Sequence, residues 1–94
     1  AILSLTRTMA LDFAADGIRV NAIAPGAIDT PMLARGFGRQ ADPDAAREAS
    51  RRRHALGRFG EAHEIAEAAL YLASDAATDS TGTTLPVDGG WLAA

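Results

Sequence analysis

Two short apolar segments, Ile18–Ala24 and Thr83–Val87, constrain the fold of this 94-residue chain more than any other feature. Each has the length of a strand and is bounded by turn-forming residues. About 60 residues separate them, which is long enough for a helical crossover and predicts a parallel, right-handed pair. Parallel sheets need more than two strands and cover on both faces. The pair therefore predicts an α/β chain that is a fragment of a larger doubly wound, Rossmann-type parallel sheet.

Ala1–Ala15 and Ala62–Ala73 have the apolar spacing of three and four residues that is typical of helices, and a third helix is expected over Asp42–Arg53 from its start signal. The first has apolar residues over a wide arc and no capping residue before it, so we expect two buried faces and polypeptide upstream. The alternative is a frayed N-terminal helix. Asp42-Pro43-Asp44 combines an N-cap acid with a proline at the first helical position.

Residues 27–41 predict a long, partly apolar loop with room for a short helix, because Pro31, Gly36 and Gly38 interrupt it. Loops of this length are usually lids, binding loops or disordered segments. Pro86 lacks a backbone N–H, which predicts an edge position or a bulge for the last strand. The order is helix, strand, loop with helix, helix and edge strand, with neither a repeat nor a linker, so we expect one domain.

Composition excludes several functions. The net charge of −3 disfavours nucleic acid and anionic membranes as partners. The chain has no cysteine, no apolar run of the ~20 residues of a membrane span, and no basic signal segment, so we expect a cytoplasmic protein. His54 and His63 lack metal-ligand spacing, so no metal site is expected. All nine basic residues are arginine, which leaves the chain without lysine.

Several segments, in order, resemble the C-terminal portion of the short-chain dehydrogenase/reductase family. The resemblance covers nearly all of the chain and is specific as an ordered set, although each segment alone is weak. The matching segments are Leu5–Leu11, Gly17-Ile18-Arg19-Val20-Asn21-Ala22-Ile23-Ala24-Pro25-Gly26, Ala27–Met32, Leu56-Gly57-Arg58-Phe59-Gly60 through Asp75, Thr81-Gly82 and Val87-Asp88-Gly89-Gly90.

The family's Gly-rich phosphate turn, its Asn-Ala-Gly segment, its catalytic serine and its Tyr-x-x-x-Lys pair are absent from these residues. Because the chain has no lysine, the Tyr-x-x-x-Lys pair cannot occur at any position in it. Tyr71, the single tyrosine, therefore lacks the lysine four residues later. We therefore assign no catalytic residue and expect the isolated chain to be inactive. The resemblance implies that residues 1–94 are the C-terminal part of one Rossmann-type domain.

The resemblance also implies a cofactor site for NAD or NADP in the intact protein, without deciding between them. Pro25 and Gly26 would pack on the nicotinamide ring, Ile28 would offer backbone groups to the carboxamide, and the Thr30 hydroxyl would bond the carboxamide or pyrophosphate. The plainer alternative is an ordinary turn after a strand. Residues 27–60 would form a substrate loop or lid whose apolar side chains face the substrate or tuck into the core: Ala27, Met32, Leu33 and Phe37.

Other residues receive plainer interpretations. Asp29 is expected to cap a turn. Arg51-Arg52-Arg53-His54 is interpreted as a solvated helix end, with an arginine that grips a substrate carboxylate as the alternative. Trp91 is either a packing residue or a subunit contact.

The sequence thus predicts part of an NAD(P)-dependent oxidoreductase that interconverts an alcohol and a carbonyl of a small-molecule substrate. Expected protein partners are further copies of the chain or a complementary N-terminal portion. The alternative is a non-catalytic fragment that associates through exposed helix faces and a strand edge.

Overall fold

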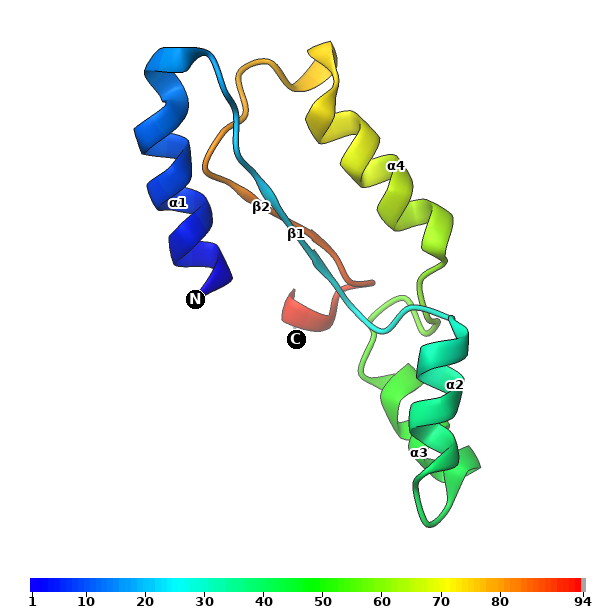
Figure 1. Cartoon of the computed structure of the whole chain (residues 1–94). Coiled ribbons are helices and arrows are strands. Elements are labelled where there is room, and N and C mark those ends of the chain that lie inside the picture. The colour runs from blue at the N-terminus through cyan, green and yellow to red at the C-terminus, as the bar shows by residue number, and fades with distance from the viewer. Residues whose placement is uncertain (94) are drawn as a thin grey trace.

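The elements of the chain follow the predicted order in a computed structural model, which describes residues 1–93 (Figure 1). The helices are α1 (Ile2–Phe13), α2 (Pro31–Gly38), α3 (Pro43–Arg52) and α4 (Ala62–Ala73), and the strands are β1 (Ala22–Pro25) and β2 (Thr84–Val87). Short 3-10 helices follow α1, α4 and β2 at Ala14–Asp16, Asp75–Ala77 and Trp91–Ala93. The two strands run between α1 and α4 (Figure 1).

The strands pair in parallel, as predicted, with Ala22 opposite Thr84 and Pro25 opposite Val87. The predicted start of the first strand at Ile18 is wrong, because side chains hold the preceding residues. Arg19 donates to the carbonyls of Ser74 and Ser80, and Asn21 bonds Ser80 and Thr83. The Val20 carbonyl also accepts from Gly82 N–H at 2.7 Å, but the regular paired register begins only at Ala22.

The helix predictions hold at α3 and α4 and need correction elsewhere. Asp42 caps α3 by accepting from Ala45 N–H at 3.1 Å, and Pro43 occupies the first turn. The first helix ends at Phe13, before a 3-10 turn and left-handed Gly17 with φ 73°. Residues 27–41 are more ordered than a loop because Thr30 caps α2 and Pro31 occupies its first turn.

The described chain is more open than a folded domain of its size. Its radius of gyration is 16.1 Å, where a compact domain of this length has about 12 Å. Its accessible surface is 6506 Å², against about 5,100 Å² for a folded monomer of 9.7 kDa. The buried residues are few: Thr6, Ala10, His54, Phe59 and Ala77.

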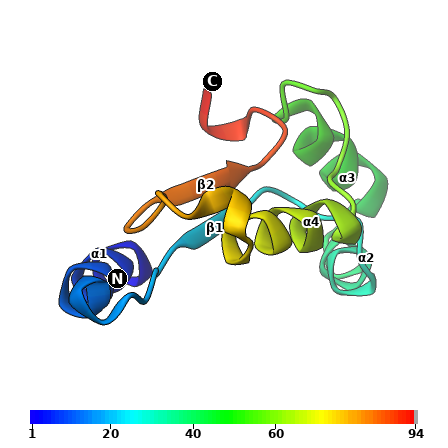
Figure 2. The same ribbon diagram turned by 90° about the horizontal axis from the view of Figure 1, so that it is seen from above.

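The expectation that the first helix buries two faces is not met in this chain. Only Thr6 and Ala10 of α1 are buried, and the ideal Cβ position of Gly82 lies 3.4 Å from the Ala10 side chain. Ile2 and Leu11 are 73% and 80% exposed, and Leu70 on α4 is 69% exposed. The view from above shows α1 nearly end-on, at the end of the molecule far from α2 and α3 (Figure 2). These helices therefore present apolar faces with no cover among the described residues.

Three loops meet beyond the carboxyl ends of β1 and β2, and we call residues 26–29, 54–60 and 87–91 the loop cluster. Helices α2 and α3 lie beside it, away from α1 (Figure 1). Ligands of open parallel sheets bind at this edge. No helix among the described residues has the length and apolar character needed to cross a bilayer.

Candidate functional site

The turn that leaves β1 is held by three separate parts of the chain. Gly26 N–H donates to the Val87 carbonyl at 3.1 Å, which extends the ladder to β2. Ala27 N–H donates to Nε2 of His54 at 3.1 Å. Gly60 donates to the Ala27 carbonyl at 3.0 Å and accepts from Asp29 N–H at 2.8 Å. Each peptide from Gly26 to Asp29 therefore has a defined orientation.

Ile28 sits in an isolated parallel bridge opposite Gly60. In such a bridge Gly60 bonds the two neighbours of Ile28, so the N–H and C=O of Ile28 itself point away from Gly60. The carbonyl accepts from the Thr30 hydroxyl at 3.3 Å. Ile28 N–H has no hydrogen-bond acceptor among residues 1–93. Ile28 thus presents a free donor beside a carbonyl with one remaining lone pair.

An open groove of 480 Å³ lies between this turn and α2, and we call it the α2 groove. It brings together seven of the eight residues predicted for the cofactor and substrate sides, and it adds Gly36 and Gln40. Its lining is Gly26, Ala27, Ile28, Thr30, Met32, Leu33, Gly36, Phe37 and Gln40. None of these side chains is charged, so the groove suits an uncharged, largely apolar group.

Pro25 is the predicted site residue that the α2 groove does not include. It lines a neighbouring hollow of 320 Å³ together with Gly26, Ala27, Asp88 and Trp91. The two hollows share Gly26 and Ala27, so Pro25 stands at their boundary. Its predicted contact with a nicotinamide ring stays a prediction.

Gly26 has a packing reason to be glycine that the sequence did not reveal. A Cβ there would lie 2.9 Å from the Asp88 Cα and 3.0 Å from His54 Nε2. Real side chains essentially never come this close to backbone atoms. The close approach that needs glycine is therefore to the chain's own loop cluster.

Thr30, and not Asp29, caps the turn before α2. Thr30 Oγ1 accepts from Leu33 N–H at 3.3 Å, and its hydroxyl proton goes to Ile28. A Thr30 bond to a cofactor oxygen requires that proton to turn away from Ile28. The prediction for Asp29 is wrong, since its carboxylate lies 3.9 Å from Arg47 on α3 instead.

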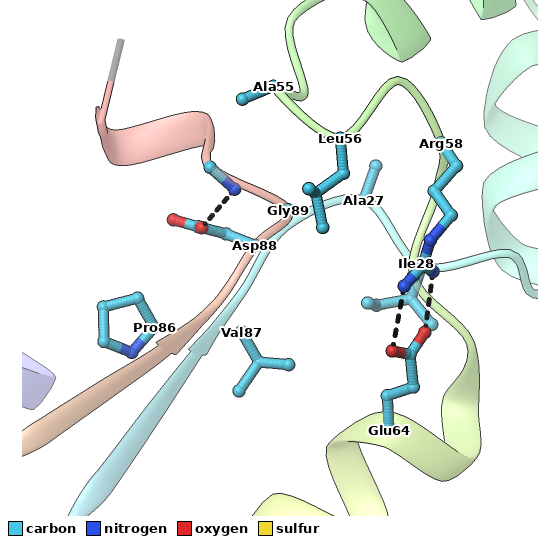
Figure 3. A pocket seen from close by; sticks show the side chains of 12 residues that line it. Ala27, Ile28, Ala55, Leu56, Arg58, Glu64, Pro86, Val87, Asp88 and Gly89 are labelled. Atoms are coloured by element: carbon cyan, nitrogen blue, oxygen red, sulfur yellow. Dashed lines mark hydrogen bonds and ion pairs between the residues drawn. The ribbon is translucent and has the colours of Figure 1, made fainter.

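A third hollow of 350 Å³ shares Ala27 and Ile28 and is bounded by an ion pair (Figure 3). Arg58 grips Glu64 with both terminal nitrogens at 2.8 and 3.1 Å. These bonds, with the backbone N–H of Glu61, lower the pKa of Glu64 from 4.5 to about 2. The ion pair thereby fastens the loop before Gly60 to the first turn of α4.

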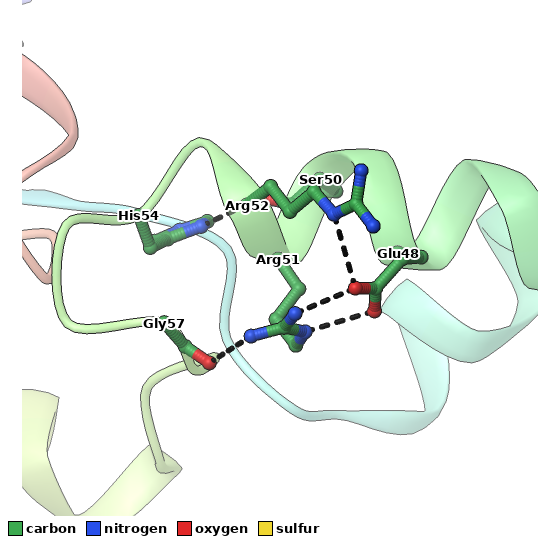
Figure 4. Close-up of polar contacts among 6 residues, drawn as sticks. All are labelled: Glu48, Ser50, Arg51, Arg52, His54 and Gly57. Carbon is green, nitrogen blue, oxygen red and sulfur yellow. Dashed lines mark hydrogen bonds and ion pairs between the residues drawn. The ribbon is translucent and has the colours of Figure 1, made fainter.

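The interpretation of Arg51–His54 as a solvated helix end is wrong for Arg51 and His54 (Figure 4). Arg51 forks onto Glu48, lowers the pKa of that carboxyl to about 2, and donates to the Gly57 carbonyl at 2.8 Å. The Arg53 guanidinium lies 4.7 Å from the centre of the Trp91 ring. His54 is only 2% exposed. Arg52 and Arg53 are both exposed to solvent.

Sequence reasoning missed His54 and Phe59. Phe59 is buried between Phe37 of α2 and His54, with ring centroids 5.9 and 5.8 Å away, and the Arg47 guanidinium lies 4.8 Å from its ring. The three preceding arginines gave His54 the pattern of a surface helix end. The available signal was its position two residues before the family-like segment that starts at Leu56.

The residues present fit the nicotinamide end of a dinucleotide. A carboxamide has one donor and one acceptor group, and Ile28 offers the complementary backbone pair at the rim of an apolar groove. Tyr71 lies on α4 and does not line the α2 groove. Among residues 1–93 no cluster of three potential metal ligands occurs.

Known proteins match this chain over almost its whole length. The family model described as "Enoyl-(Acyl carrier protein) reductase" matches residues 1–92. A 2,5-dichloro-2,5-cyclohexadiene-1,4-diol dehydrogenase of Sphingobium indicum is 49% identical over 94 residues. "Dehydrogenase/reductase SDR family member 6" of Rattus norvegicus is 43% identical over 91 residues. A crystal structure from Agrobacterium tumefaciens, described as a 2-deoxy-D-gluconate 3-dehydrogenase with bound NADP, is 43% identical with a TM-score of 0.88.

These matches use nearly all of this chain and a minority of each relative. They cover 99%, 97% and 99% of the chain, respectively, but 36%, 37% and 36% of the proteins matched. The chain thus spans little more than a third of the length of its relatives. The predicted Rossmann-type α/β fold with a parallel sheet is confirmed by the likeness to solved structures.

Proposed function

Because the chain belongs to the short-chain dehydrogenase/reductase family, we propose that it forms the C-terminal part of an NAD(P)-dependent oxidoreductase. That enzyme interconverts an alcohol and a carbonyl of a small molecule. Residues 1–94 form the nicotinamide-side wall of its site, and residues 27–60 form the substrate loop or lid.

The observation that carries this proposal is the orientation of Ile28 at the edge of the α2 groove. Its N–H points away from Gly60 and has no partner among residues 1–93, while Gly26 and Ala27 continue the wall. A bound NAD(P) supplies a hydride, or accepts one, at its nicotinamide ring. The task of Ile28 is to fix the orientation of that ring through the carboxamide.

The substrate side of the groove is assigned to Ala27, Met32 and Leu33, with Phe37 behind them. Met32 is 74% exposed and Leu33 half-buried, so both have surface to give to a ligand. Apolar walls exclude water from a site of hydride movement. The uncharged lining favours a substrate whose reacting part is also uncharged.

The proton that accompanies hydride transfer needs a donor that these residues do not supply. The chain has no lysine, and Tyr71 lies outside the groove. We therefore assign the acid/base group to the remainder of the enzyme. The 94-residue chain alone is expected to be inactive.

The experiment begins with the denaturing intact mass of the natural protein. A mass near 25 kDa, the size of one α/β domain of about 250 residues, supports the proposal. That protein is then assayed for NAD- and NADP-dependent oxidation of secondary alcohols, with the 94-residue chain as the control. A mass of 9.7 kDa, or a longer protein that neither binds nor reduces either nucleotide, would contradict it.

A second candidate, a non-catalytic association fragment, is favoured by the exposed apolar side chains of α1 and α4. Ile2, Leu11 and Leu70 lie on helix faces without cover among the described residues. Such surface promotes association with further copies or with a complementary N-terminal portion. Sedimentation tests this candidate, because a chain that stays monomeric at high concentration excludes it.

A further inference from the structure

His54 is the most buried polar side chain of the loop cluster, and every direction of its ring is used. It is 2% exposed, and it follows the last turn of α3. Its ring lies edge-on to Phe59 and to Trp91, with centroids 5.8 and 5.0 Å away. It therefore packs against Phe59 of its own loop and against Trp91 from the distant C-terminal part of the chain.

The partners of the two ring nitrogens fix the protonation of the imidazole. Nδ1 lies 2.9 Å from the Ser50 carbonyl, which can only accept, so Nδ1 carries the proton (Figure 4). Nε2 lies 3.1 Å from Ala27 N–H, which can only donate, so Nε2 carries none. One neutral tautomer alone satisfies both contacts.

We propose that His54 is a positioning residue, which sets the Gly26–Ala27 turn, and through it Ile28, by accepting the Ala27 N–H bond on Nε2. The Ser50 carbonyl selects the tautomer that makes this possible. The catalytic consequence rests on the proposed function, because Ile28 is the residue assigned to the nicotinamide. The structural link to the turn does not depend on it.

The glycines around the ring show how closely the turn is fitted to it. A Cβ on Gly26 would lie 3.0 Å from Nε2, and one on Gly89 would lie 3.5 Å from both Cβ and Cδ2 of His54. Both positions that face this imidazole, 26 and 89, are occupied by glycine. The turn is therefore packed directly against the ring, and a variant without the imidazole loses the contacts that define the path of the turn.

Two substitutions separate the two nitrogens of the ring. His54→Asn keeps an amide donor near the Nδ1 position for Ser50 but has no atom at the Nε2 position. His54→Gln places an amide oxygen near the Nε2 position, where it can accept from Ala27, but gives up the Ser50 bond. His63→Asn, at an exposed position on α4, is the matched control.

In the full-length enzyme we expect His54→Asn to lower kcat about 30-fold with the KM for nicotinamide nucleotide changed less than about threefold, since small misplacements of a reacting group cost this much in rate. His54→Gln is expected to restore kcat to within about fivefold of the parent, and His63→Asn to leave it unchanged. An equal loss of kcat in His54→Asn and His54→Gln overturns the proposal. A change that is confined to KM overturns it as well.

Amide hydrogen exchange separates failure of this proposal from failure of the proposed function. We expect exchange at Ala27, whose N–H is bonded to Nε2 of His54, to accelerate at least tenfold in His54→Asn and much less in His54→Gln, whether or not the protein has activity. Equal exchange in the parent and His54→Asn overturns the structural link.

A measurement on the unaltered enzyme covers the case in which both variants misfold. The ring ¹⁵N shifts of His54 are expected to report a protonated Nδ1 and an unprotonated Nε2. The opposite tautomer leaves no acceptor for Ala27 and overturns the proposal. The expected tautomer supports it.

Discussion

The loop cluster and the outer faces of α1 and α4 are built in opposite ways. In the loop cluster, side chains and backbone groups from three loops hydrogen-bond and pack against one another. Two of the five buried residues, His54 and Phe59, lie there. On the helix faces, large apolar residues such as Ile2, Leu11 and Leu70 face solvent. The loop cluster finds its contacts within the chain, whereas the helix faces have no cover among the described residues.

This contrast separates shape from stability. The turn that carries Ile28 takes its geometry from specific short contacts, so a short stretch of chain can define it. The sheet takes its stability from apolar area, which only large facing surfaces supply. The chain can thus define one wall of a site while lacking the core that a folded domain of its size has.

The largest expected effect on stability is that of Gly90→Ala. Gly90 has φ 93°, and a Cβ there would lie 2.5 Å from the Ala55 Cβ. Backbone strain and overpacking together should lower the free energy of unfolding of the full-length enzyme by about 3 kcal/mol. Chemical denaturation measures this. Gly36→Ala, with open space around it on α2, is the control and should be neutral or stabilising.

A smaller effect should distinguish Gly26→Ala from Gly60→Ala. The added methyl at Gly26 meets the Asp88 backbone at 2.9 Å, whereas at Gly60 it meets the far end of the Ile28 side chain at 2.8 Å. A side-chain end can rotate and a backbone cannot. We expect a loss of about 2 kcal/mol for Gly26→Ala and under about 1 kcal/mol for Gly60→Ala, measured by denaturation. Equal losses would show that the loop cluster is not rigid.

On the helix faces, substitution should change association more than folding. In the 94-residue chain, Ile2→Ser with Leu11→Ser should change the free energy of unfolding by less than about 0.5 kcal/mol, because both side chains are exposed. The same pair should reduce self-association in sedimentation velocity. Unchanged association would show that the α1 face is not the associating surface. A reduced association of Leu70→Ser would then place that surface on α4.

The smallest effect is a pH dependence of the ion pair between Arg58 and Glu64. Because the pKa of Glu64 is lowered from 4.5 to about 2, its stabilising effect is present above pH 4.5 and is lost as the pH falls toward 2. Glu64→Gln should therefore be less stable than the parent at neutral pH and equal to it near pH 2. Thermal unfolding across this range measures the difference. Glu67→Gln removes a carboxylate of the same helix without touching Arg58 and is the control.

The sequence predicted the elements whose signals are local. The cap at Asp42 and the proline at 43 act within one turn of chain, and the structure places them as expected. The parallel pairing also followed from the length of the connection between the strands. The groove gathers seven of the eight residues named from the family resemblance, all except Pro25.

The failures all involve residues whose role depends on distant chain. Arg19 and Asn21 were included in the strand, yet they bond carbonyl and N–H groups some sixty residues later. His54 was taken for a solvated residue because its neighbours in sequence are arginines. Its neighbours in space are Ala27, Phe59 and Trp91.

The sequence by itself determined the order of helices and strands and the family to which the chain belongs. Caps, turns and apolar periodicity act over a few residues, so one-dimensional patterns carry them. Only the tertiary structure decided that His54 holds the turn of Ile28 and that a side chain at position 26 would collide with the Asp88 backbone. These contacts join loops that the crossover brings together at one edge of the sheet, and a short contact between distant residues leaves no periodic trace in sequence.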